Sequence, residues 1–190
     1  MHQVIPGTTL KYSESARNEA FSLVSPVLEA TGGLTLSQLA KLTGLEGTTI
    51  QNWIKRGWVA SAKSKKYSEK QVVRILLINM LRGAMKLDDI AKLMCFVNGD
   101  VEDTSDDIIS DIHLYNMLCR IIFTAEEQGT FDPVQIGKII EEEHSANRKY
   151  ITDPLKLSQA VYVMVLAYRS GYLKAEMEKK LSEMNILKGE

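Results

Sequence analysis

A short stretch of the chain, residues 48–56, concentrates side chains that suit the reading of nucleic-acid bases. An Asn or Gln carboxamide can donate and accept hydrogen bonds together at an adenine edge. A Thr hydroxyl can do either, and a Lys ammonium can pair with guanine or with a phosphate. We therefore expect five side chains of this stretch to contact bases: Thr48, Thr49, Gln51, Asn52 and Lys55.

Basic side chains that follow could hold the backbone of the same polyanion. They are Arg56, Lys63, Lys65 and Lys66. Positive groups beside a base-reading element position the protein on the phosphates and make its affinity depend on salt. A run of lysines is often only a solvated loop, but the polar residues next to this one favour contacts with phosphate.

The charges of the chain are separated along its length. The 190 residues have a net charge of −1, yet positions 41–86 carry ten Lys or Arg residues against two Glu. Asp and Glu dominate the next positions, 88–111. The basic part could therefore meet a polyanion while the whole protein stays near neutral.

Two short helices are predicted to position these residues. Thr35 and Gln38 have the spacing of a capping box, and Thr43 and Gly44 end the helix that the box opens. A second helix is expected over about 47–56. Its inward side would carry Ile50, Trp53 and Ile54. Two short helices joined by a tight turn form a helix-turn-helix, whose second helix commonly enters a DNA groove.

A minimal wing is predicted to follow. We expect two very short strands, 58–60 and 66–67, on either side of the loop 61–65. Ser68 and Gln71 form a second capping box, which opens a helix that ends at Gly83. Lys70 and Arg74 are expected on the exposed side of that helix, and a further helix is expected over 87–97.

Most of the remaining chain is also predicted to be helical. Residues 13–30 fit one helix that Pro26 should kink or split. Three helices are expected after the acidic segment, one over about 106–128 and two that begin at the pairs Asp132-Pro133 and Asp153-Pro154. The expected class is all-α with a two-strand wing. It would have an N-terminal extension (1–33), a winged helix-turn-helix (34–98) and a C-terminal helical domain (99–190).

The segments LTLSQLAKLTGLEGTTIQNWIKRGWV and KKYSEKQVVRILLINMLRGAMKLDDIAKLM resemble the DNA-binding domain of the MerR family of transcriptional regulators. The matching positions are Thr35, Leu39, Ala40, Thr43, Gly44, Thr49, Ile50, Gly57, Tyr67, Ser68, Leu81, Ile90 and Leu93. The resemblance implies that Lys66 and Tyr67 take the place of a wing Arg and Tyr, which adds Tyr67 to the expected phosphate contacts.

Over most of its length the chain is most similar to a bacterial family called domain of unknown function 1836, which has a MerR-like N-terminal half and a helical C-terminal half. Two departures from MerR regulators stand out. Gln51-Asn52 replaces their Arg-aromatic pair, and no long dimerisation helix follows the domain directly. The promoter-distorting mechanism of MerR activators is therefore not carried over.

The C-terminal helices are expected to dimerise the protein or to take a signal. The candidate dimer surface is the last helix, through Val161, Met164, Val165, Tyr168 and Tyr172, which could equally belong to the intramolecular core. A homodimer would double the DNA site that a single small reading helix covers.

The predicted function is a cytoplasmic, sequence-specific regulator that binds double-stranded DNA. No catalytic constellation, metal-ligand spacing or cofactor motif is visible, no membrane segment is expected, and Cys95 and Cys119 are expected to be buried thiols. Two other functions stay open. One is a winged-helix module that docks a protein, and the other is a sensor whose helices hold a small molecule.

Overall fold

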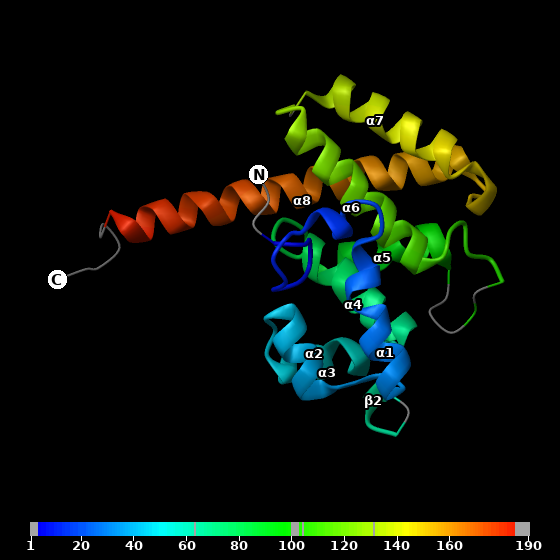
Figure 1. Cartoon of the computed structure of the whole chain (residues 1–190), viewed down its shortest axis with the longest axis vertical. Helices are drawn as coiled ribbons and strands as arrows, with labels where there is room; N and C mark the ends of the chain where they lie inside the picture. The colour runs from blue at the N-terminus through cyan, green and yellow to red at the C-terminus, as the bar shows by residue number, and fades with distance from the viewer. Residues whose placement is uncertain (1–3, 63, 100–102, 104, 131, 185–190) are drawn as a thin grey trace.

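The computed structural model describes residues 4–62, 64–99, 103, 105–130 and 132–184 (Figure 1). In this part of the chain the structure is mostly helical, with one two-stranded sheet, which confirms the predicted all-α class. The α-helices are α1 Ser25–Thr31, α2 Leu36–Thr43, α3 Gly47–Lys55, α4 Glu69–Leu81, α5 Leu87–Asn98, α6 Asp111–Glu127, α7 Pro133–Ala146 and α8 Pro154–Glu183. Short 3-10 helices occupy Glu14–Ala16 (η1), Ala20–Leu23 (η2) and Arg148–Tyr150 (η3).

The predicted capping boxes are present at the starts of α2 and α4. The Thr35 hydroxyl accepts from the backbone N–H of Gln38, whose side chain accepts from the backbone N–H of Thr35. Ser68 and Gln71 make the equivalent box at α4. The helix starts could be predicted because each box satisfies backbone donors that have no partner within the helix.

The sheet differs from the predicted wing. Its strands are β1 Leu34–Thr35 and β2 Lys66–Tyr67, paired antiparallel with Leu34 opposite Tyr67. Residues 58–60 form no strand, so the prediction that they pair with 66–67 was wrong. Leu34 and Tyr67, which face each other across the sheet, are both buried and belong to the core.

Helix α4 lies at the centre of the molecule. Nearly every residue from Gln71 to Leu81 is buried, because the helix contacts α2 and β2 at one end of the molecule and α5, α6 and α8 in the rest. The core is continuous across the predicted boundaries at 33 and 98. Arg74, expected on an exposed side, is only 7% exposed, so that prediction was wrong.

The N-terminal segment contacts both α6 and α4. Residues 13–30 form η1, η2 and α1, with Pro26 in the first turn of α1, which agrees with the predicted split. The Phe21 ring packs edge-on against Tyr115 of α6, and the Tyr115 hydroxyl donates to the Pro6 carbonyl at 2.8 Å. The Asn79 carboxamide of α4 donates to the carbonyls of Gly7 and Thr43, each at 2.9 Å.

Helix α8 has a packed half and a projecting half. Gly171 and Gly83 let it approach the end of α4, since a Cβ on Gly83 would lie 3.2 Å from the Cα of Gly171. The C-terminal part then extends beyond the other helices (Figure 1). Val161, Met164 and Val165 are completely buried against the other helices, so they belong to the core and not to a dimer surface. Tyr168 is half-buried, and Tyr172 remains exposed.

The two thiols differ in their surroundings. Cys119 is buried, and burial raises its pKa to about 12. Cys95 is exposed, which contradicts the prediction of two buried thiols. Its neighbour Phe96 is exposed too, whereas Met94 on its other side is completely buried. Within the described residues, no helix is long and apolar enough to cross a membrane, and no His, Cys, Asp and Glu side chains gather into a metal site.

Candidate nucleic-acid interface

Helix α3 separates its apolar and polar side chains cleanly. Ile50 and Trp53 are buried, with 0% and 2% of their surface exposed, and Ile54 is half-buried. The opposite side carries the predicted base-reading residues. Thr48, Gln51, Asn52 and Lys55 are exposed and Thr49 is half-buried. All five therefore lie on or beside one solvent-facing surface of α3, which we call the reading face.

The turn before α3 is held rigidly. Gly44 ends α2 in the left-handed conformation with φ of +70°, and its N–H donates to the Ala40 carbonyl. The buried Thr43 hydroxyl donates to the Leu39 carbonyl at 2.8 Å. A glycine suits this position because left-handed backbone strains residues that carry a Cβ. The reading face is thus attached to α2 through a short, hydrogen-bonded connection.

The loop before β2 lies at the same end of the molecule as α2 and α3 (Figure 1). Lys65 and Lys66 are exposed, and Ser64 and Lys65 have φ of +52° and +61° in the left-handed region. The Lys66 ammonium donates to the Thr31 carbonyl, which holds it beside the end of α1. Lys63 lies outside the described residues.

Tyr67 does not fit its expected role at a phosphate. Only 5% of its surface is exposed, and burial raises the pKa of its hydroxyl. The side chain is part of the core beneath the sheet, because its β2 neighbour Lys66 takes the outward position of the two-residue strand.

Arg56 follows the reading face and is already engaged. Its guanidinium lies over the Trp58 ring, 5.1 Å from the centroid, and 3.9 Å from a carboxylate oxygen of Asp88. Both charged side chains are more than half exposed, so this pair adds little stability. Arg56 can therefore exchange Asp88 for a phosphate at small cost.

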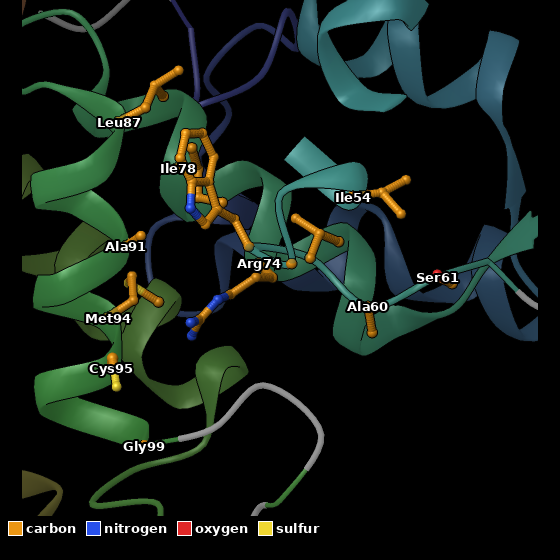
Figure 2. Close-up of a pocket in the computed structure, with 13 residues that line it drawn as sticks. Ile54, Ala60, Ser61, Arg74, Ile78, Leu87, Ala91, Met94, Cys95 and Gly99 are labelled. Atoms are coloured by element: carbon orange, nitrogen blue, oxygen red, sulfur yellow. The ribbon is translucent and has the colours of Figure 1, made fainter. Parts of the chain in front are cut away.

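A cavity of about 370 Å³ lies behind α3, between the loop 57–61 and α5 (Figure 2). Ala91, Met94 and Cys95 line its α5 side, and the Arg74 side chain crosses toward them from α4. A second, larger cavity of about 650 Å³ shares Val59, Ala60, Ser61 and Arg74 with the first. We call the larger one the Arg74 cavity.

Asp111 is the main partner of Arg74. One guanidinium nitrogen of Arg74 lies 3.4 Å from each carboxylate oxygen of Asp111, and the Asn98 amide donates to the same carboxylate at 2.9 Å. Asp107 lies nearby, and its pKa is raised to about 6 because it is partly buried and because Asp111 and Asp106 repel its charge. Sequence reasoning missed this cluster because its members are separated by up to 37 residues and no local pattern connects them.

Comparison with known proteins finds a relative and a family to which the chain is similar. It is 24% identical to a protein of Bacillus subtilis (strain 168) named "Uncharacterized protein YkrK", over 96% of this chain and 81% of the relative. No solved structure matches it. Residues 21–118, just over half of the chain, match the family described as "Domain of unknown function (DUF1836)". These residues contain α2, α3, the sheet, α4 and α5. The chain belongs to the DUF1836 family.

Proposed function

We propose that the protein is a sequence-specific, double-stranded-DNA-binding transcriptional regulator that inserts α3 into a groove in the manner of a MerR-like winged helix. The observation that carries this proposal is the reading face. Ile50 and Trp53 are buried on one side of α3. The side chains of Thr48, Gln51 and Asn52 are therefore all exposed to solvent. Short polar side chains on one exposed helix side, next to basic residues, suit contact with base edges and phosphates.

The proposed roles divide by chemistry. Thr48, Thr49, Gln51, Asn52 and Lys55 contact bases. Arg56, Lys65 and Lys66 contact phosphates, and Lys63 belongs to the same loop by sequence. Tyr67 is buried in the core beneath the sheet and takes no part in these contacts. The placement of α2, α3 and the β2 loop at one end of the molecule lets these residues meet the same duplex (Figure 1).

We also propose that the protein binds DNA as a homodimer, with the projecting part of α8 as the contact. Tyr172, Leu173, Met177 and Met184 are exposed there, with 38% to 63% of their surface accessible. Residues 173, 177, 181 and 184 repeat at intervals of three and four, which gives one apolar side on a helix. A second copy of the same helix would cover it.

Fluorescence anisotropy tests the DNA proposal most directly. A labelled pool of duplex fragments would be titrated with the full chain at several salt concentrations. The test variant is Lys55/Lys65/Lys66→Ala, and the control is Lys92/Lys138/Lys149→Ala, which removes the same charge from exposed positions on α5, α7 and η3. Circular dichroism would confirm that both fold.

The expected result is binding that weakens steeply with salt and enriches particular fragments. The test variant should reduce the slope of log K against log salt by about two, since it removes the two phosphate contacts of Lys65 and Lys66 and each lost contact removes about 0.9. The control should keep the native slope. If the native chain shows no affinity for the pool even at low salt, the winged helix is a protein-docking module instead.

A further inference from the structure

The Arg74 cavity separates the helix-turn-helix from the C-terminal helices. Its walls come from the loop 59–62, the start of α4, the end of α5 and the start of α6. A volume of about 650 Å³ falls within the range of about 300–1,000 Å³ that small-molecule sites occupy. Five apolar residues line part of the wall: Val59, Ala60, Ala62, Val73 and Ile112.

The polar part of the wall is rich in donors. Lys66 and Lys70 are exposed at the cavity, and Arg74 is buried in its wall. The starts of α4 and α6 also meet there through their N-cap residues Ser68 and Ser110. Helix N-termini carry partial positive charge, which adds to the three cationic side chains.

Arg74 has fewer partners than a buried guanidinium needs. Its side chain is 8% exposed, and its contacts to Asp111 at 3.4 Å are long for charge-assisted hydrogen bonds. Its Nε is fully buried and has no hydrogen-bond partner among the described residues. A buried donor without an acceptor destabilises the fold, so an acceptor brought by a ligand would stabilise this group.

The two acidic side chains that line the cavity do not neutralise its three cationic side chains. Asp111 is bound by Asn98 and begins α6, where the helix dipole stabilises its charge. Asp107 is the other carboxyl in the wall, against the three cations Lys66, Lys70 and Arg74. The described charges that line the cavity therefore favour an anion.

From this geometry we propose that the Arg74 cavity binds a small organic acid, with its carboxylate on Arg74 and Lys70 and its apolar body against Val59, Val73 and Ile112. The loop 59–62 that would cover the ligand continues into the basic loop and β2. An occupant would therefore contact the segment that leads to the DNA-facing residues. That consequence rests on the proposed function, but binding itself does not.

NMR of the full-length protein tests the binding without DNA. The ¹⁵N-labelled chain would be titrated with benzoate, phenylacetate and hexanoate, while the side-chain Nε–Hε signal of Arg74 is followed. Benzamide and phenylacetamide serve as neutral counterparts of the same shape. The expected result is a saturable shift of the Arg74 signal with at least one acid and none with the amides.

Variants separate a specific site from a general charge effect. Arg74→Lys keeps the charge but loses the fork of donors, and should weaken binding by about tenfold. Lys70→Gln changes an exposed residue, so the fold is retained, and should weaken binding severalfold. Arg82→Lys changes an exposed arginine directly after α4 and outside the cavity, and should leave the affinity unchanged.

The proposal is overturned if none of the three acids moves the Arg74 signal, if the amides move it equally, or if Lys70→Gln binds as well as the native chain. Because no DNA is present, these outcomes are independent of the anisotropy experiment. A chain that binds DNA but no acid keeps the proposed function and loses only the ligand site.

Discussion

The side-chain amide of Asn79 donates a 2.9 Å hydrogen bond to the carbonyl of Thr43, the last residue of α2. The same amide also donates to the carbonyl of Gly7. A single side chain of α4 therefore holds both the end of α2 and the N-terminal segment at the centre of the molecule.

Replacing Asn79 should loosen this attachment. Asn79→Ala leaves two carbonyls without their donor, and we expect a loss of about 1–3 kcal/mol in the free energy of unfolding. Urea denaturation followed by circular dichroism measures it. Asn147→Ala, which removes an amide that donates only within the end of α7, is the matched control and should cost less. Equal losses would show that the Asn79 bonds have no special role.

Replacing the reading-face amides should change sequence preference more than overall affinity. If Gln51 and Asn52 contact base edges, Asn52→Ala removes about 1–3 kcal/mol of discrimination between the preferred fragment and a mutated one. The salt slope should stay the same, because no phosphate contact is lost. Selection from a random duplex pool measures the preference, and anisotropy at several salt concentrations measures the slope; both are repeated with Lys65→Ala. A variant that retains the native preference would remove Asn52 from the proposed set.

Two glycines inside helices should respond to alanine in opposite directions. A Cβ on Gly171 would lie 3.2 Å from the backbone of Gly83, so Gly171→Ala should separate α8 from the end of α4 and lower the melting temperature. A Cβ on Gly137 of α7 meets nothing within 4 Å. Gly137→Ala should therefore stabilise the protein by up to about 1 kcal/mol through helix propensity. Differential scanning calorimetry of the two variants distinguishes them.

The pH dependence of stability should contain a contribution from Asp107. Its pKa rises from 3.8 to about 6 on folding, mainly through burial. The neutral carboxyl therefore favours the fold below pH 3.8, and this contribution is lost as pH rises through about 6. Asp107→Asn should be more stable than the native chain at pH 7.5, by about 1 kcal/mol for this half-buried group. The two should become equal near pH 3.5.

Thermal denaturation across pH 3.5–8 measures this difference. Glu29→Gln, which neutralises an exposed carboxyl on α1, is the control and should follow the native curve. A native stability that does not fall between pH 4 and 6 relative to Asp107→Asn would contradict the assignment.

The two cysteines should react at very different rates. In the folded protein a thiol reagent at pH 8 should modify Cys95, which is exposed, and spare Cys119, which is buried with a pKa of about 12. Both should react in denaturant. Mass spectrometry after digestion identifies the modified residue, and modification of Cys119 at the rate of Cys95 in the native protein would contradict the packing around α6.

Sequence patterns within a few residues made the positions of most helices predictable. The capping boxes at Thr35 and Ser68 and the Asp-Pro pairs that open α7 and α8 mark helix starts through interactions within a few residues. The start of α6 was expected near Asp106, but Ser110 caps it, because its hydroxyl accepts from the His113 N–H. The reading face was also predictable, since the buried side of α3 follows a simple helical period.

Contacts between distant segments were not predictable in the same way. Pairing of β2 with β1 joins positions more than 30 residues apart, and nothing local favours it over 58–60. Arg74 is buried because α6 brings Asp111 to it, and Val161, Met164 and Val165 are covered by helices that the sequence of α8 does not reveal. A side chain's exposure depends on which other elements pack against it. The apolar period of a single helix does not show which elements those are.

Because α4 is buried on nearly all its sides, the chain cannot be cut into separate domains next to it. A fragment that stopped at the predicted boundary of 98 would keep α4 but lose α6 and α8, and would leave Ile75, Leu76 and their neighbours open to water. Such a piece should aggregate and not behave as a free-standing folded unit. The family match agrees with this view, since it runs on to Leu118, inside the part of α6 that covers α4. The part of the chain that carries α2 and α3 is therefore not a detachable module, and any shortened version of the protein must keep the helices that cover α4.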